Sequence, residues 1–182
     1  MLNRFAELNE TQQIEEATGE GFLALYNAKF GTSYRVVRIA GAGESPDVYC
    51  FNSNGESLNI EVTMTEDRSK DIAATLGRSD TRSLEYLKRN IENAGKGLEP
   101  PLYSTLEGVS ETLVDRIQAK LVKSYGSDVA LVVRDTSGVD WDWDTVIPQI
   151  RSKLALDRRN SFDRGIWILS RDKGRMFRVD EF

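Results

Sequence analysis

The chain has no histidine and only one cysteine, Cys50, among its 182 residues. The lack of histidine excludes Ser-His-Asp and Cys-His nucleophilic catalysis, a histidine general base and a histidine metal site. A lone cysteine excludes an internal disulfide and a cysteine-ligated zinc site. Carboxylates remain available, and they bind Mg²⁺ or Mn²⁺ through oxygen alone. A hydrolase of this composition is therefore expected to work through carboxylates and a metal.

Long apolar runs are also missing. No stretch approaches the length of a membrane span, and the first ten residues, MLNRFAELNE, hold no apolar segment of signal-peptide length. The sequence therefore predicts no membrane partner and, because a single thiol suits a reducing compartment, a cytoplasmic protein. The hydrophobic fraction of 40% and the charged fraction of 29% are ordinary for a globular protein. We expect one domain over residues 1–182, large enough to bury a core without staples.

Charge is unevenly distributed along the chain, whose net charge is −5. Residues 1–67 carry a net charge of −7, residues 68–96 of +3, residues 97–150 of −5 and residues 151–182 of +4. An acidic region that could hold a metal, beside basic segments that could hold phosphate, is typical of a nuclease. Chance patchiness of solvated faces explains the same pattern equally well.

Hydrophobic periodicity and turn residues predict the order of elements. The first helix is expected over residues 11–30, with Thr11 as its cap and Gly31 as its end. Strands are expected over residues 34–40, 47–51 and 57–64, the last two joined by an Asn-Gly turn. The later predictions are helices over 81–94, 110–125 and 143–156, a loop over 96–108, and strands over 129–133, 165–169 and 176–179. This order predicts an α/β fold, in which a mixed sheet has helices on both faces.

Two carboxylates lie on neighbouring predicted strands. Asp47 follows Pro46, which fixes the entry angle of its strand, and Glu61 lies within the next strand. Adjacent antiparallel strands can bring two such side chains close enough to share a divalent metal. That metal could polarise a phosphodiester and lower the pKa of a water molecule. Strand alternation places Glu61 on the face opposite Ile60 and Val62, so a glutamate that simply faces water is the alternative.

The order helix, strand, Pro46-Asp47 strand, Glu61-x-Thr63 strand, helix, strand resembles the PD-(D/E)xK, or restriction-endonuclease-like, superfamily over roughly residues 11–133. The resemblance implies a restriction-endonuclease-like core and a Mg²⁺-dependent nuclease that hydrolyses DNA. It also implies that Asp47, Glu61 and an acid on the first helix bind Mg²⁺ or Mn²⁺. That helix acid would be Glu20, or Glu16 one turn earlier, and an exposed helix face is the alternative for both. Since related enzymes that cleave duplexes often act as dimers, the resemblance also allows a homodimer.

The sequence departs from this family at Thr63, where the family has lysine. Threonine can orient a water molecule, but it has no charge with which to stabilise hydroxide or a developing phosphorane. Some members carry the lysine on the following helix, where Lys120 and Lys123 are the candidates. Lys120 is closer to the apolar positions Leu113 and Ile117, and a solvated lysine is the alternative for both. The missing lysine also supports a second hypothesis, an inactive nuclease scaffold that binds nucleic acid or a protein partner.

Other motifs have simpler explanations. Trp141-Asp142-Trp143-Asp144 could stack a base, but tryptophan anchors followed by a helix-capping aspartate are the expected roles. The basic loops at residues 157–160 and 171–175 could contact phosphates or be ordinary charged turns.

Overall fold

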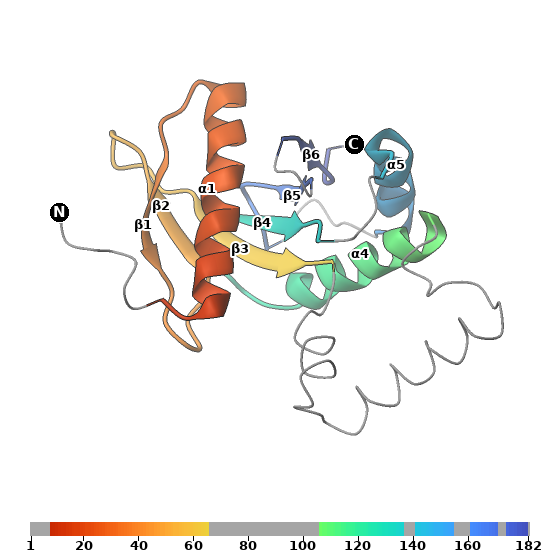
Figure 1. Ribbon diagram of the computed structural model, residues 1–182, viewed down its shortest axis with the longest axis horizontal. Helices are drawn as coiled ribbons and strands as arrows, with labels where there is room; N and C mark the ends of the chain where they lie inside the picture. The colour runs from red at the N-terminus through yellow and green to blue at the C-terminus, as the bar shows by residue number, and fades with distance from the viewer. Residues whose placement is uncertain (1–7, 66–105, 137–140, 155–160, 171–173, 182) are drawn as a thin grey trace.

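A computed structural model of the chain describes residues 8–65, 106–136, 141–154, 161–170 and 174–181. Within these residues, six strands form one mixed sheet in the order β1-β2-β3-β4-β5-β6 (Figure 1). The strands are β1 (Arg35–Ile39), β2 (Val48–Phe51), β3 (Asn59–Met64), β4 (Val129–Arg134), β5 (Ile166–Leu169) and β6 (Met176–Arg178). The β1–β2, β2–β3 and β5–β6 pairs are antiparallel, whereas β3–β4 and β4–β5 are parallel. The predicted α/β fold with a mixed sheet is confirmed.

The N-cap residue of helix α1 (Glu10–Phe30) is Asn9, not the predicted Thr11. The Asn9 side chain accepts a hydrogen bond from Gln12 N–H at 3.0 Å, and the Gln12 side chain accepts one from Asn9 N–H at 3.1 Å. This reciprocal pair satisfies two N–H groups that the helix leaves open, so Asn9 is the more effective start. The predicted end is correct, because Gly31 adopts the left-handed conformation, with φ of 65°, that terminates helices.

Helices α4 (Leu106–Leu121) and α5 (Trp143–Lys153) follow β3 and β4 along the chain. The helix expected over 110–125 lies earlier in the chain than predicted, because α4 begins at Leu106 and ends at Leu121. The loop expected over 96–108 is therefore wrong for residues 106–108, which lie beyond the two prolines that suggested it. Helix α5 accommodates Pro148 in its interior. The helix expected over 81–94 lies outside the described residues.

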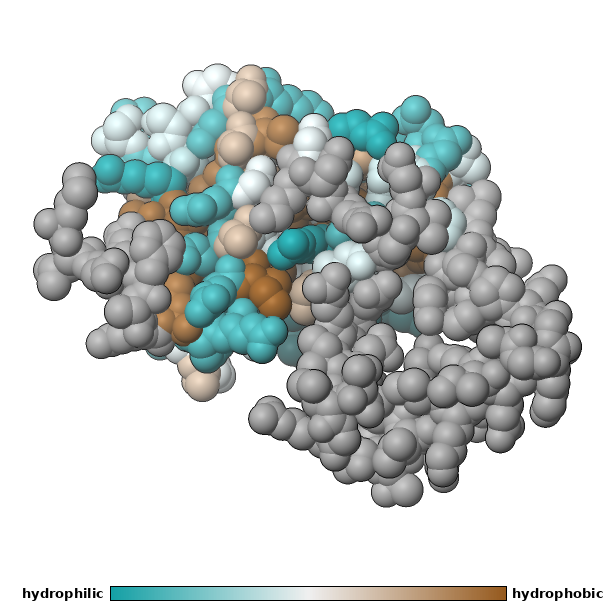
Figure 2. All heavy atoms as spheres, in the orientation of Figure 1, coloured by the Kyte–Doolittle hydropathy of each residue, from teal (hydrophilic) through white to brown (hydrophobic). Residues whose placement is uncertain are grey.

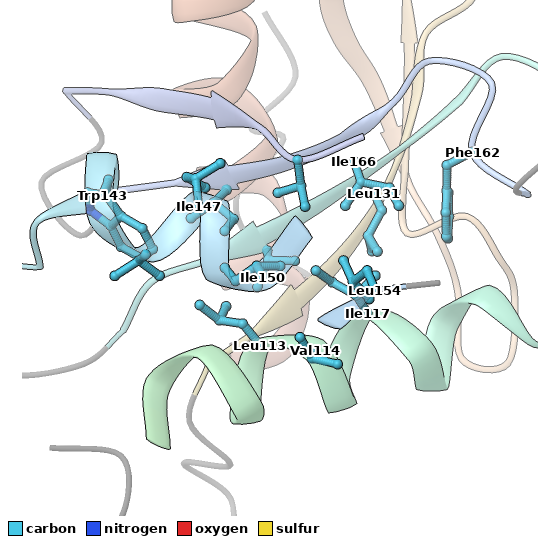
Figure 3. Packing of buried hydrophobic residues seen from close by; sticks show 14 of the residues in the cluster. Leu113, Val114, Ile117, Leu131, Trp143, Ile147, Ile150, Leu154, Phe162 and Ile166 are labelled. Atoms are coloured by element: carbon cyan, nitrogen blue, oxygen red, sulfur yellow. The ribbon is translucent and has the colours of Figure 1, made fainter. Parts of the chain in front are cut away.

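Helices lie on both faces of the sheet, as the sequence predicted. Helix α1 packs on one face, while α4 and α5 pack on the other (Figure 1). Alternation along β4 divides its side chains, with Ala130 and Val132 directed to the α1 side and Leu131 and Val133 to the α4–α5 side. Figure 3 shows the hydrophobic core on the α4–α5 face, in which side chains of α4 and α5 point toward those of β4 and β5. Its labelled members include Leu113, Val114, Ile117, Leu131, Trp143, Ile147, Ile150 and Ile166.

The surface of the described residues shows no long apolar element. On the face drawn in Figure 2, hydrophilic and hydrophobic side chains are interspersed. Three large apolar side chains are well exposed, and they lie apart along the chain: Phe30 ends α1, Phe51 ends β2 and Val122 follows α4. In the part of the chain that the structure describes, no helix has the length and apolar character needed to cross a bilayer.

Candidate active site

The candidate site lies where β2 and β3 separate. Val48 pairs with Ile60, and two further steps of this antiparallel register would bring Val62 opposite Pro46. Instead of continuing the ladder there, Val62 N–H donates a hydrogen bond to Oδ2 of Asp47 at 2.7 Å. The Asp47 carboxylate thus takes the place of a backbone acceptor, and this bond fixes its position beside β3.

Glu61 directly precedes Val62 on β3, and its side chain is only 5% exposed. Its Oε1 accepts from Lys120 Nζ at 2.6 Å, and its Oε2 accepts from Ser45 Oγ at 2.9 Å. The alternative that Glu61 faces water is therefore wrong. A freely solvated Lys120 is wrong as well, because its side chain is 21% exposed and ion-paired. The two strands and α4 thus bring an acid pair and a lysine together.

Helix α1 adds a third carboxylate, Glu15. The helix lies close to the sheet at Gly19, where a Cβ atom would be 3.1 Å from Cγ1 of Val48. Glu15 is one turn before Gly19 and therefore shares the helix face that looks toward the sheet. Its charge interacts with those of Asp47 and Glu61, so the three acids form one electrostatic group.

Burial and mutual repulsion raise the pKa values of two of these acids. The pKa of Glu15 rises to about 7 because the side chain is partly buried and because Asp47 and Glu61 repel its charge, while Lys120 opposes the rise. The pKa of Asp47 rises to about 6, chiefly through burial and then through Glu61. The hydrogen bond from Val62 N–H and the charge of Lys120 act in the opposite direction. Three carboxylates thus share one ion-paired lysine, and when ionised they leave an excess of negative charge.

The acid of α1 whose charge acts on Asp47 and Glu61 is Glu15, which was not singled out from the sequence. Glu20 is exposed, whereas Glu16 is half-buried, as Glu15 is. Successive helical residues are rotated by about 100°, so neither shares the direction of Glu15. A signal was present in the sequence: Thr18 and Gly19 are small residues that let a helix approach a sheet, and Glu15 precedes them by three and four positions.

The other predicted residues lie near the site without a direct bond to its acids in the described part of the chain. Lys123 is exposed just beyond α4, and its charge still lowers the pKa of Asp47. Thr63 is half-buried in β3 opposite Val133 of β4, and alternation places it on the same face as Glu61. The cation that contacts Glu61 is therefore Lys120.

Two polar residues complete the surroundings of Glu61. Ser45, whose hydroxyl binds the carboxylate, was not singled out from the sequence, since an isolated serine in a loop carries no signal. Tyr125 is 8% exposed, and its Oη is buried beside Glu61. Burial first, and the neighbouring Glu61 charge second, raise the pKa of this phenol. Tyr125 thus adds a buried phenol beside Glu61 from the segment that follows α4.

The donor set suits a hard divalent cation. It consists of carboxylate oxygens, the ligands that Mg²⁺ and Mn²⁺ prefer, and a bound cation would relieve the excess negative charge. Among the described residues, no three His, Cys, Asp or Glu side chains are already close enough to hold an ion together. Mg²⁺ commonly uses only one or two carboxylates with several water molecules, so Asp47 and Glu61 would be a sufficient pair.

The tryptophan motif has a structural role. Trp141 and Trp143 are buried, so the base-stacking alternative fails, and the anchor role is confirmed. Asp142 is the residue before α5, but its side chain accepts from Thr145 Oγ1 at 2.7 Å and makes no capping bond to the backbone. The basic loop at residues 157–160 and most of the one at 171–175 lie outside the described residues.

Comparisons of the chain with protein-family models, with curated proteins and with solved structures give no match.

Proposed function

We propose that the chain has a restriction-endonuclease-like core and is a Mg²⁺-dependent nuclease that hydrolyses DNA phosphodiester bonds. The observation that carries this proposal is that Asp47 accepts a hydrogen bond from Val62 N–H at 2.7 Å beside Glu61, whose Oε1 accepts from Lys120 Nζ at 2.6 Å. Glu15 of α1 adds its charge to this pair. Buried like charges with raised pKa values are unfavourable for folding, and such arrangements cluster at functional sites. The order of the described elements supports the same fold.

Each residue has a distinct role in this proposal. Asp47 and Glu61 would hold Mg²⁺ or Mn²⁺, which supplies charge stabilisation and lowers the pKa of a bound water. The bond from Val62 N–H engages Oδ2 of Asp47, so Oδ1 would be the metal ligand. Lys120 would hold the attacking water or a phosphate oxygen, which restores the charge that Thr63 lacks. Glu15 adds negative charge that strengthens cation binding.

A second candidate function is a binding module on an inactive nuclease scaffold. Two observations favour it: Thr63 replaces the motif lysine, and Lys120 already occupies one oxygen of Glu61. This candidate predicts no divalent-metal site, while nucleic acid or a protein partner still binds.

Hydrolysis of supercoiled plasmid and of single-stranded DNA, each with Mg²⁺ and with Mn²⁺, tests the proposal. Wild-type protein should cleave at least one substrate, and Asp47→Ala should not. Glu20→Gln serves as the matched control, because it removes an exposed carboxylate from α1 without touching the site. Absence of cleavage by the wild type under all four conditions would remove the nuclease assignment. Calorimetry with Mn²⁺ then separates the candidates, since only the nuclease requires a saturable site that Asp47→Ala abolishes.

A further inference from the structure

The sheet face that bears Asp47 and Glu61 is only partly covered. Helices α4 and α5 pack on β4 and β5, and within the described ranges their core has no member from β1, β2 or β3. The same-face side chains of β1 and β2 consequently reach the surface. Phe51 is 41% exposed, the Arg38 side chain is 50% exposed, and Arg35 is exposed.

A β-bulge in β1 gathers two arginines on this face. In a regular strand Arg35 and Arg38, three residues apart, would point to opposite sides of the sheet. The register of β1 shifts between Val36 and Arg38, so that Val36 and Ile39 both pack on the α1 core. Arg35 and Arg38 therefore share the opposite face, the one on which the candidate active site lies.

Each arginine lies opposite an aromatic residue of β2. Arg35 pairs with Phe51 and Arg38 with Tyr49, and the Arg38 guanidinium lies 4.0 Å from the centroid of the Tyr49 ring. Same-face residues of a strand are about 7 Å apart, so Phe51, Tyr49 and Asp47 form a row that ends at the carboxylates. Two cross-strand pairs, each of an arginine and an aromatic residue, thus lie in line with Asp47 along β2.

We propose that these four residues, Arg35, Arg38, Tyr49 and Phe51, form a track that binds a single-stranded nucleic acid and leads it to Asp47. The inference rests on the proposed nuclease function and specifies the form of its substrate. Unpaired bases expose their faces and stack on aromatic rings or guanidinium planes, whereas the bases of a duplex are stacked on one another. Two rings in line on one face of β2 therefore favour an unpaired nucleic-acid strand.

Charge on the track suits a phosphate backbone. Arg35 is exposed on the edge strand, and Lys123, also exposed, adds positive charge that acts on Asp47. Arg38 is paired with Glu44 at 2.5 Å, but both side chains are about half exposed. Such exposed pairs contribute little to stability, so Arg38 can exchange its carboxylate partner for a phosphate.

Fluorescence anisotropy in EDTA, which prevents hydrolysis, tests the track with a labelled oligothymidylate and with a duplex of equal length. The single strand should bind at least about tenfold more tightly than the duplex. Tyr49→Leu and Phe51→Leu should each weaken single-strand binding by about tenfold, the loss expected for one stacked base. Arg35→Gln should reduce the salt dependence of binding by about one phosphate contact. Phe30→Leu, which removes an exposed ring at the end of α1, is the matched control and should stay within about twofold of wild type.

Three results would overturn the track: no single-strand binding, a duplex that binds as tightly as the single strand, or folded leucine variants with wild-type affinity. Circular dichroism establishes that the variants are folded. Because binding is measured without a divalent metal, its outcome is separate from that of the hydrolysis assay. Ring-dependent binding without cleavage would remove the nuclease assignment alone, whereas cleavage with ring-independent binding would remove the track alone.

Discussion

Replacement of Asp47 by asparagine should make the protein more stable at alkaline pH while it removes a ligand of the candidate site. Asparagine has nearly the same shape, and its amide oxygen can still accept the hydrogen bond from Val62 N–H. What disappears is the negative charge, which is partly buried and close to Glu61. The variant therefore separates the electrostatic penalty of the site from its packing.

The magnitude follows from the pKa of Asp47, which rises from 3.8 to about 6 in the folded state. Between these values the folded protein holds a proton that the unfolded chain has lost, so its stability falls as pH rises toward 6 and is level above it. A shift of this size corresponds to at most about 3 kcal/mol, and partial exposure of the carboxylate reduces the expected gain to about 1–2 kcal/mol. At pH 8 the variant should show this gain, and near pH 4 the gain should vanish.

Urea unfolding in EDTA at several pH values between 4 and 8 measures the effect. Unfolding is followed by the fluorescence of the buried tryptophans Trp141, Trp143 and Trp167. Asp115→Asn, which neutralises an exposed carboxylate of α4, is the control and should show no comparable pH-dependent gain. The reasoning is refuted if Asp47→Asn is no more stable than wild type at pH 8, or if its gain is the same at both ends of the range. Addition of Mg²⁺ should then stabilise the wild type and leave the variant unchanged.

Three further expectations concern the other groups of the site. Lys120→Met should lower DNA hydrolysis by about 10²–10³-fold, and full activity would exclude Lys120 from the chemistry. Because buried Glu61 loses its ion-pair partner, the variant should also be less stable by about 1–3 kcal/mol in urea titrations. Thr63→Lys in that background places an ammonium on the face of Glu61 and should restore part of the lost cleavage rate, whereas an unchanged rate would show that position 63 cannot replace position 120. Glu15→Gln should weaken Mn²⁺ binding in calorimetry and make stability less dependent on pH between about 4.5 and 7, since it removes a carboxylate with a raised pKa. Glu20→Gln should do neither, and equal effects of the two variants would show that Glu15 has no special place.

The sequence predicted those parts of the fold that local rules determine. Alternation of apolar residues and the turn between β2 and β3 were enough to place both strands and to put Glu61 on the face opposite Ile60 and Val62. The end of α1 at Gly31 was likewise set by the conformation that a single residue prefers. The cap at Asn9 was missed because the competing Thr11 is also a good cap residue, and only the bonds with Gln12 separate the two.

The site itself depended on tertiary geometry that no local rule contains. Alternation predicts which face Glu61 occupies, but whether water or another element covers that face is decided by α4, whose Lys120 is 59 residues away. The phase of α1 relative to the sheet selects Glu15 over Glu16 and Glu20. That phase is set by the contact between Gly19 and Val48, which joins distant parts of the chain.

The position of Lys120 on α4 gives the interior of the protein an influence over the site. A lysine two residues after Glu61 would be held by the same strand as the acid, whereas Lys120 reaches Glu61 only as far as α4 keeps its place on the sheet. That place depends on Ile117 and Leu113, which are completely buried against β4, β5 and α5. Interiors are densely packed and transmit small displacements. A change as small as Ile117→Val could therefore alter the reach of the ammonium, so that variation at residues far from any substrate would tune the chemistry while position 63 remains free to vary.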